Sequence, residues 1–183
     1  KQTVTYTCNY LFMCSGYYSY KGGYEPDFPG RDEFAGSILH PQKWPEDVDY
    51  EGKRVVVIGS GATAMTMVPA MADSAAHVTM LQRSPTYVVS RPAVDPIANG
   101  LRKVLPDGVA YNMTRWKNAT MGEFFYKQTR SQPGKVRDKL LKLATKELGE
   151  DTVAAHFTPE YDPWDQRLCL IPDSDLFNSI NSG

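Results

Sequence analysis

A glycine-rich turn between an apolar strand and a helix of small residues constrains this chain most. Residues 55–58 read VVVI, residues 59–64 read GSGATA, and small and apolar residues continue to residue 76. A second apolar segment, HVTMLQ, begins at His77. The segment 55–82 therefore predicts a βαβ unit of about 30 residues, with two parallel strands and a right-handed crossover. Pro69 lies inside the helix and predicts a bend there.

The turn itself has the pattern GxGxxA, which is typical of dinucleotide-binding loops. The first glycine permits a tight turn, the second lets the backbone approach a pyrophosphate, and the alanine lets the helix pack closely on the strand. The free N–H groups and the dipole of the helix then stabilise the anion. The predicted cofactor-binding residues are Gly59, Ser60, Gly61, Ala62, Thr63 and Ala64. A purely structural turn is the alternative.

The residues after the second strand indicate which dinucleotide binds. NAD sites place a carboxylate at this point to bind the ribose diol, whereas here the sequence is Gln82-Arg83-Ser84. Arg83 can form charge-assisted hydrogen bonds to a 2′-phosphate, and Ser84 adds a hydroxyl donor. Such a contact contributes ~1.5 to 3 kcal/mol, or roughly 10- to 100-fold in affinity, so NADP is favoured over NAD. An exposed arginine that merely ends a strand is the alternative.

Composition excludes several other classes of protein. With 20 Lys and Arg against 21 Asp and Glu, the 183 residues carry a net charge of -1 and no general attraction for nucleic acid or an anionic membrane. No apolar run approaches the ~18 residues of a membrane span, and no signal peptide opens the chain. Cys8, Cys14 and Cys169 show neither CxxC spacing nor a histidine cluster, so we expect no metal site and a reducing, cytoplasmic location.

The remaining elements follow from local patterns. Residues 3–14 predict a strand, a turn and a second strand at the edge of a sheet, and residues 17–49 predict an irregular connection. Residues 86–90 predict a third extended segment, and residues 95–149 predict helices interrupted at Pro106 and Pro133. The chain begins with Lys rather than Met, so we expect it to be a piece of a longer protein.

The helix predicted over residues 135–148 is amphipathic. Its apolar face is predicted to contain Val136, Leu140, Leu143, Ala144 and Leu148, and four lysines occupy the other face. A solvated basic face is the favoured interpretation, and contact with an anion is the alternative.

One further motif points to a family. Residues 34–45 contain FxGxxxHxxxW followed by Pro, with Phe34, Gly36, His40 and Trp44 at its fixed positions. On chemistry alone, His40 could be a hydrogen-bonded loop histidine and Trp44 a plug. The pattern, however, resembles the fingerprint of type I Baeyer–Villiger monooxygenases, flavoproteins of the flavin-containing monooxygenase superfamily. The resemblance implies a catalytic role for His40 and a cofactor-binding role for Trp44.

Three other stretches are similar to the same family. Residues 12–17 (FMCSGY) resemble the strand and turn that lead back from its FAD domain, and residues 81–87 (LQRSPTY) resemble its segment for the NADPH 2′-phosphate. Residues 163–167 (PWDQR) resemble a stretch that often carries a Lys-Arg pair. The resemblance implies that Arg167 stabilises the flavin peroxide anion and contacts the nicotinamide end of NADP, and that Gln166 stands in the position of the family's Lys.

The expected fold is α/β: a Rossmann-like NADPH-binding domain with flanking helices and part of an FAD-domain edge. Residues 1–49 are predicted to contribute edge strands and a linker, residues 50–167 the NADP domain with a helical insertion, and residues 168–183 the return towards the FAD domain. The family's N-terminal GxGxxG, which holds FAD, does not occur in these residues. The FAD site is therefore expected to lie mostly outside them.

The resemblance implies the NADPH-binding portion of an FAD-dependent monooxygenase. Such enzymes use O2 to insert one oxygen atom into a ketone or to oxygenate a heteroatom, and we expect this portion alone to be inactive. The alternatives are an NADPH-dependent flavin reductase, an N-hydroxylating monooxygenase, and a non-catalytic NADPH-binding module.

Overall fold

The computed structural model describes residues 3–16 and 19–183, which fall into two compact units, Lys1–Val48 and Asp49–Gly183. The described residues of the first unit form two short 3-10 helices, η1 (Arg31–Glu33) and η2 (Pro41–Lys43), and are otherwise irregular. The predicted irregular connection is thus confirmed for residues 19–49, while residues 17 and 18 lie outside the described part.

The two strands predicted within residues 3–14 do not form. Residues 3–16 contain no helix or strand, and their large side chains, among them Tyr6, Tyr10 and Phe12, are exposed. A strand is stable only when its backbone groups pair with a neighbour and one face is buried. Neither condition is met here, so alternation along the sequence alone was insufficient.

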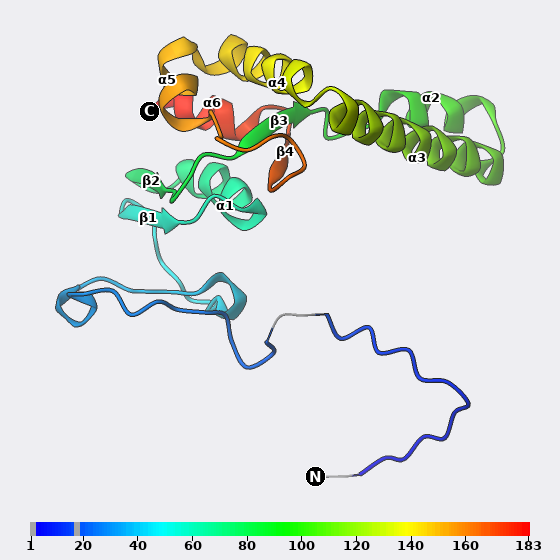
Figure 1. The fold of residues 1–183 in the computed structure, drawn as a ribbon. Helices are drawn as coiled ribbons and strands as arrows, with labels where there is room; N and C mark the ends of the chain where they lie inside the picture. The colour runs from blue at the N-terminus through cyan, green and yellow to red at the C-terminus, as the bar shows by residue number, and fades with distance from the viewer. Residues whose placement is uncertain (1–2, 17–18) are drawn as a thin grey trace. The chain divides into compact units, whose positions relative to one another are not determined.

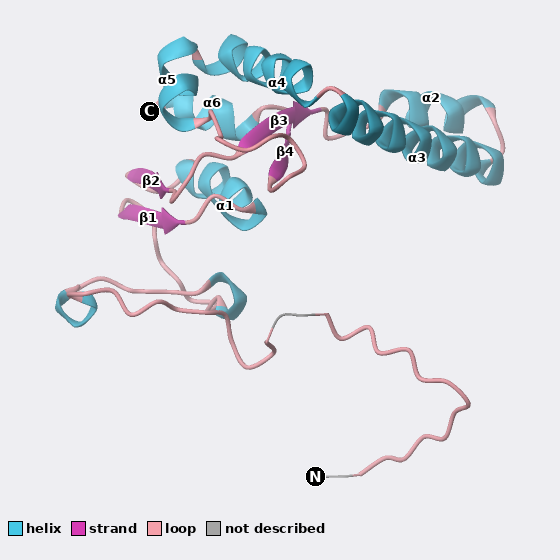
Figure 2. Ribbon diagram, in the orientation of Figure 1, coloured by secondary structure: helices cyan, strands magenta, loops and turns pink. Residues whose placement is uncertain are grey.

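The second unit is α/β, as predicted (Figure 1). Its elements are β1 (Arg54–Ile58), α1 (Ala62–Ala72), β2 (His77–Leu81), β3 (Tyr87–Arg91), α2 (Pro96–Val104), α3 (Asp107–Ser131), α4 (Pro133–Leu148), α5 (Glu150–His156), β4 (Leu168–Pro172) and α6 (Asp175–Ser182). The strands form two parallel pairs, β1 with β2 and β3 with β4 (Figure 2). The βαβ unit and the third extended segment are therefore confirmed.

Helix α1 is the centre of this unit. It packs against β1, β2, β4 and α6, and it buries Met65, Val68 and Met71. Burying a side chain of this size stabilises the fold by roughly 1.5 to 3 kcal/mol. The helix runs through Pro69 without ending, and the bend predicted there stays a prediction. The core continues into Val88, Ala144, Leu148, Val153, Phe157, Cys169, Ile171, Leu176 and Phe177.

The β1–β2 pair is covered on one face. Val57, Val78 and Met80 pack against the core, whereas the alternate residues Val56 and Ile58 are 60% and 61% exposed. Side chains alternate between the two faces of a strand, so a single helix buries only every second residue. The apolar run of β1 is therefore only half covered by this chain.

Helices α2 and α3 form a hairpin that Asp95 stabilises. The Asp95 carboxylate accepts hydrogen bonds from the N–H groups of Ile97 and Ala98, at 3.0 and 3.1 Å, and forms an ion pair with Lys117 of α3. The hydrogen bond from Lys117 and these N–H groups hold the pKa of Asp95 below its ordinary value. The cap thus joins the two helices as well as starting α2.

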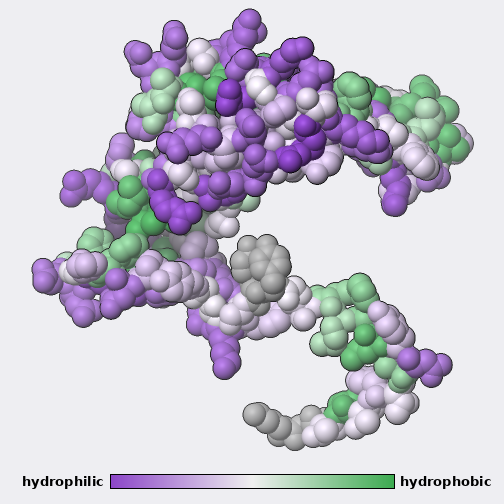
Figure 3. Space-filling view, in the orientation of Figure 1, coloured by the Kyte–Doolittle hydropathy of each residue, from purple (hydrophilic) through white to green (hydrophobic). Residues whose placement is uncertain are grey.

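The breaks predicted at Pro106 and Pro133 are confirmed, because Pro106 precedes α3 and Pro133 begins α4. Apolar side chains gather at the α2–α3 end of the surface (Figure 3). Val104 of α2 and Trp116 and Phe124 of α3 are among the exposed apolar residues of these helices. Within the described residues, α3 and every other helix are too short or too polar to cross a membrane.

The amphipathic prediction for α4 is partly wrong. Leu143 is 44% exposed, whereas Leu141 packs against the core together with buried Ala144 and Leu148. The buried stripe thus follows positions 141, 144 and 148, a spacing of three and four residues that leaves Leu143 beside it. The four lysines of α4 are exposed, as expected of a solvated face.

The C-terminal elements were incompletely anticipated. Gly149, in the left-handed region with a φ of 82°, ends α4, and α5 follows directly, whereas the predicted helical stretch stopped at residue 149. β4 pairs with β3, and α6 packs on α1, so both lie within the unit Asp49–Gly183. That residues 168–183 lead towards an FAD domain stays a prediction.

The free cysteines should differ sharply in reactivity. Cys8 and Cys14 are exposed, whereas Cys169 in β4 is buried, and this burial raises the pKa of its thiol despite the nearby charge of Arg167. Because the thiolate is the nucleophile, we expect iodoacetamide at neutral pH to label Cys169 at least ~10-fold more slowly than the other two, with equal labelling in denaturant. Mass spectrometry of the peptides measures this, and equal rates in the folded chain would contradict it.

The same raised pKa gives a sign to the pH dependence of folding. Below the ordinary thiol pKa of about 8.5, Cys169 is protonated in both states and its contribution to stability is complete. As the pH rises above that value towards the folded-state pKa, the unfolded state loses its proton first and stability falls. A Cys169→Ser variant should therefore lose less stability on going to alkaline pH.

Candidate functional site

The glycine turn has the geometry of a phosphate-binding loop. The N–H of Gly59 donates to the carbonyl of Leu81 at 2.8 Å, which ties the turn to the end of β2. Gly59 has a φ of 135°, a conformation that favours glycine. Gly61 precedes α1 with an ordinary φ of -85°, and a Cβ added there would meet no atom within 4 Å. The loop is thus open on the side from which a ligand would approach.

The N-terminus of α1 faces this open side without a capping side chain. Gly61 cannot cap the helix, and the first helical hydrogen bond runs from Met65 N–H to the Gly61 carbonyl at 3.1 Å. In the described part of the chain the N–H groups of Ala62, Thr63 and Ala64 have no acceptor. Three such donors and the helix dipole favour a bound anion. Ala64 is 5% exposed, as its predicted packing role requires.

The ends of all four strands meet beside this loop. Ser60 follows β1 and Ser84 follows β2, while Thr86 directly precedes β3 and Arg167 directly precedes β4. The parallel register that pairs Tyr87 with Leu168 sets Thr86 and Arg167 side by side. Residues that are more than 100 positions apart in the sequence are therefore brought into one site.

Four side chains at this junction form a hydrogen-bond network. Thr86 Oγ1 donates to Ser60 Oγ at 3.2 Å, and Ser60 Oγ donates to the Ser84 carbonyl at 3.4 Å. Arg167 donates from Nε to Thr86 Oγ1 and from Nη2 to Ser84 Oγ, both at 3.3 Å. Thr86 is fully buried and Ser60 is 6% exposed, whereas Ser84 and Arg167 are half-buried. The network thus runs from the interior to the surface.

A second set of contacts fixes the backbone of Arg167. Tyr161 donates its hydroxyl to the Arg167 carbonyl at 2.9 Å, and Tyr87 donates to the Tyr161 carbonyl at 2.7 Å. The two rings meet edge to face, with centroids 5.5 Å apart. Tyr87 is 1% exposed, and burial raises the pKa of its hydroxyl, so it stays a donor at neutral pH. Cys169 closes the group by donating to the Ser60 carbonyl at 4.0 Å.

The other predicted cofactor-binding residues of this unit lie at the surface. Arg83 and Gln166 are exposed, and neither makes a hydrogen bond or an ion pair within residues 3–16 and 19–183. Arg83 follows β2 directly beside Ser84, so its charge is available to a ligand at the loop. Gln166 precedes Arg167, but nothing in the structure gives it a role.

A cavity of about 380 Å³ lies against the edge of β2. Val68, Val78 and Ile180 contribute apolar walls, and Gln82 adds a polar group. Gln82 donates from Nε2 to the His156 carbonyl at 2.7 Å, and its buried Oε1 has no partner among the described residues. Gln82, the first residue after β2, therefore directs its amide group towards the end of α5.

His40 and Trp44 belong to the first unit and flank η2. His40 Nδ1 accepts a hydrogen bond from the N–H of Gln42 at 3.2 Å and so caps the 3-10 helix, and Trp44 is the residue that ends it. A Cβ added at Gly23 would come within 2.0 Å of the His40 ring, and one at Gly36 within 2.6 Å of the Phe34 ring. The motif thus has a structural role in shaping this loop, while a catalytic role for His40 stays a prediction.

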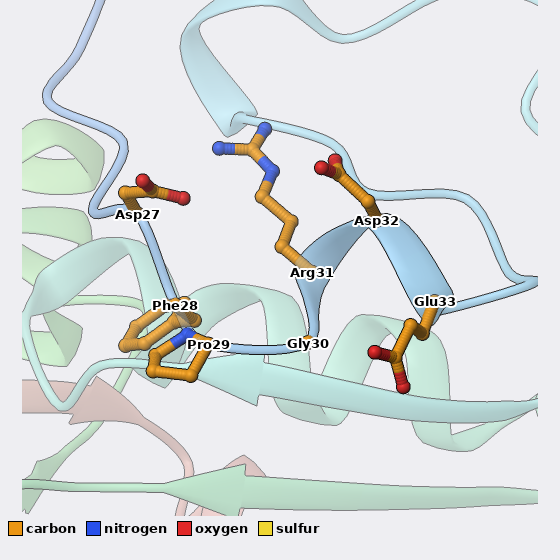
Figure 4. Close-up of a pocket in the computed structure, with 7 residues that line it drawn as sticks. All are labelled: Asp27, Phe28, Pro29, Gly30, Arg31, Asp32 and Glu33. Carbon is orange, nitrogen blue, oxygen red and sulfur yellow. The ribbon is translucent and has the colours of Figure 1, made fainter.

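A shallow hollow of about 300 Å³ surrounds η1 in the same unit (Figure 4). Figure 4 shows Arg31 rising between Asp27 and Asp32, and Arg31 pairs with Glu25 at 2.7 Å. Within the two described stretches, no three His, Cys, Asp or Glu side chains gather closely enough to hold a metal ion.

Sequence reasoning missed Thr86, Tyr87 and Tyr161 as parts of the site. Thr86 occupies an unremarkable position at the start of a strand, and its importance follows only from the β3–β4 register. The available signal was that Thr86 and Tyr87 lie within residues 81–87, the stretch that resembles the family's segment for the NADPH 2′-phosphate.

Known monooxygenases resemble this chain in sequence. A family profile described as "Flavin-binding monooxygenase-like" matches residues 3–100, which is more than half of the chain. The "FAD-containing monooxygenase EthA" of Mycobacterium tuberculosis is 54% identical over 97% of this chain and 37% of its own length. The "Probable FAD-binding monooxygenase AlmA" of Acinetobacter baylyi is 52% identical over 98% of the chain and 36% of its own length. The chain thus spans little more than a third of these relatives.

Solved structures share the fold at low sequence identity. A structure titled "Oxidized steroid monooxygenase bound to NADP" superimposes with a TM-score of 0.65 and 19% identity, covering 86% of this chain and 37% of the other. A cyclohexanone monooxygenase from Rhodococcus bound to NADP+ gives a TM-score of 0.62 and 18% identity, covering 87% and 36%. The α/β fold and the resemblance seen in the sequence are thereby confirmed, and the chain belongs to the flavin-binding monooxygenase-like family.

Proposed function

We propose that this chain is the NADPH-binding portion of an FAD-dependent monooxygenase. The observation that carries the proposal is the open glycine loop at the uncapped N-terminus of α1, with Arg83 and Ser84 at the adjacent end of β2. The names of the curated relatives, which refer to FAD, and the solved structures with bound NADP support it.

The residues present fit the phosphates of NADPH. The pyrophosphate would lie against Gly61 and the free N–H groups of α1, where the structure leaves room for it and supplies donors. Arg83, which has no carboxylate partner in the described stretches, would bind the 2′-phosphate together with Ser84.

When bound in the whole protein, NADPH supplies a hydride and FAD activates O2, so that one oxygen atom enters a ketone or adds to a heteroatom. The contribution of this chain is to bind and orient NADPH. Arg167 and His40 are proposed catalytic residues by resemblance, and both the substrate class and the activity of the whole protein belong to the proposal.

Arg83 should determine the preference for NADPH. We expect isothermal titration calorimetry to show tighter binding of NADPH than of NADH, and Arg83→Ala to weaken NADPH binding by roughly 10- to 100-fold while leaving NADH unchanged. Arg115→Ala, which removes an exposed arginine from α3, is the matched control and should bind as the unmodified chain does. Equal affinity for the two nucleotides, unchanged by Arg83→Ala, would overturn the proposal.

Substitutions at the two loop glycines should affect fold stability and nucleotide binding differently. Gly61→Ala places a methyl group in open space on an unstrained backbone, so the melting temperature should stay unchanged while both nucleotides bind more weakly. Gly59→Ala forces a φ of 135° on alanine and should destabilise the fold by about 1 to 3 kcal/mol. Thermal unfolding and calorimetry on the same samples test both effects. Normal nucleotide binding by Gly61→Ala would show that the loop is only a structural turn.

A further inference from the structure

We propose that Thr86 is a positioning residue that determines the preference for NADPH over NADH. Its hydroxyl orients the side chain of Arg167, and Arg167 in turn orients the hydroxyl of Ser84. The inference rests on the proposed function, because it concerns the same nucleotide site. It assigns the selection of the 2′-phosphate to a buried group that does not itself touch the ligand.

Thr86 is buried between the glycine loop and Arg167. Its side chain is 0% exposed, so its hydroxyl has no water to bond with and its partners decide its orientation. It donates to Ser60 Oγ in the glycine loop and accepts from Arg167 Nε. One buried hydroxyl therefore connects the loop that would hold the pyrophosphate to the one arginine of the network.

The hydroxyl protons of Thr86 and Ser60 are both used within the network. A hydroxyl has a single proton to donate. The proton of Thr86 goes to Ser60 Oγ, and that of Ser60 goes to the Ser84 carbonyl. Ser84 Oγ accepts from Arg167, and in the described part of the chain its own proton has no acceptor. Ser84 is thus the hydroxyl of the network that can still donate to an incoming ligand.

Arg167 restricts the orientation of the Ser84 hydroxyl. Arg167 occupies one lone pair of Ser84 Oγ, which limits where the Ser84 O–H can point. Ser84 is half-buried and adjoins exposed Arg83, so its hydroxyl is next to the residue that would bind a 2′-phosphate.

Thr86 is the residue that holds the guanidinium of Arg167 beside Ser84. The carbonyl of Arg167 is held by Tyr161, and its guanidinium bonds to Thr86 Oγ1 through Nε and to Ser84 Oγ through Nη2. Without the Thr86 acceptor the side chain is free to turn to solvent. Ser84 would then lose its fixed orientation, and the benefit would be lost only for a ligand that carries the 2′-phosphate.

The test compares Thr86→Val, which keeps the shape but removes the hydroxyl, with Thr86→Ser, which keeps the hydroxyl. Calorimetry with NADPH and NADH should show that Thr86→Val weakens NADPH binding by about 10-fold and NADH binding by less than about 2-fold. Thr86→Ser should retain the preference of the unmodified chain. An equal loss for both nucleotides would mean that Thr86 only supports the loop, and either that result or no loss at all would overturn the inference.

A second variant keeps the inference testable if Thr86→Val unfolds. Ser84→Ala alters a half-buried side chain and should reduce NADPH binding selectively. Where Thr86→Val does fold, the double variant should bind NADPH no more weakly than Ser84→Ala alone. An unaltered preference in Ser84→Ala would contradict the inference. Arg83→Ala separates the two levels: if it abolishes the preference while Thr86→Val and Ser84→Ala do not, the proposed function stands and only the role of Thr86 fails.

Discussion

The packing of α1 between the two strand pairs is the constraint on which the rest of the second unit depends. One helix buries Met65, Val68 and Met71 against β1, β2, β4 and α6, and the same packing fixes where its N-terminus points. The glycine turn then follows from geometry, since β1 must connect to α1 within three residues. Hydrophobic packing therefore determines where this polar site lies. The turn requires a positive φ at residue 59, which glycine adopts readily and other residues adopt only with strain.

The polar network at the strand ends has a different physical character. Its hydrogen bonds are 3.2 to 3.4 Å long, longer than the ~2.8 Å of a tight charge-assisted bond. Its stabilising contribution to the fold is correspondingly small. What it supplies is orientation: a buried hydroxyl, a half-buried arginine and a half-buried serine are held in fixed relation beside an anion-binding helix terminus. Such preorganisation lowers the cost of ordering side chains when a ligand binds.

The sequence predicted the local elements well and the long-range ones poorly. The βαβ unit, the helix breaks at Pro106 and Pro133, and the loop at residues 59–64 all depend on interactions within about 30 residues, which local pattern captures. Thr86 and Arg167 meet only because β3 pairs with β4 in one particular register, and no local pattern contains that information. Leu143 was misplaced for a similar reason, because the buried stripe of α4 is set by what packs on it.

The two strands predicted in residues 3–14 failed because strand formation needs a partner. The motif at Phe34, His40 and Trp44, unlike those strands, needs no distant partner. The family resemblance rests on the spacing of these residues, and the structure explains part of that spacing by local interactions. His40 and Trp44 lie at either end of one 3-10 helix, so their separation of four residues is a structural requirement as well as a fingerprint. Shared motifs therefore identify the family here before they identify a catalytic role.

The central claim is that the glycine loop and the end of β2 together bind NADPH, and a two-dimensional NMR titration of the ¹⁵N-labelled chain with NADP+ tests it most directly. The account predicts that the amide signals of residues 59–64 and of Arg83, Ser84 and Thr86 shift as the nucleotide is added, while those of α3 stay in place. Shifts confined to other parts of the chain, with these two segments unchanged, would contradict it.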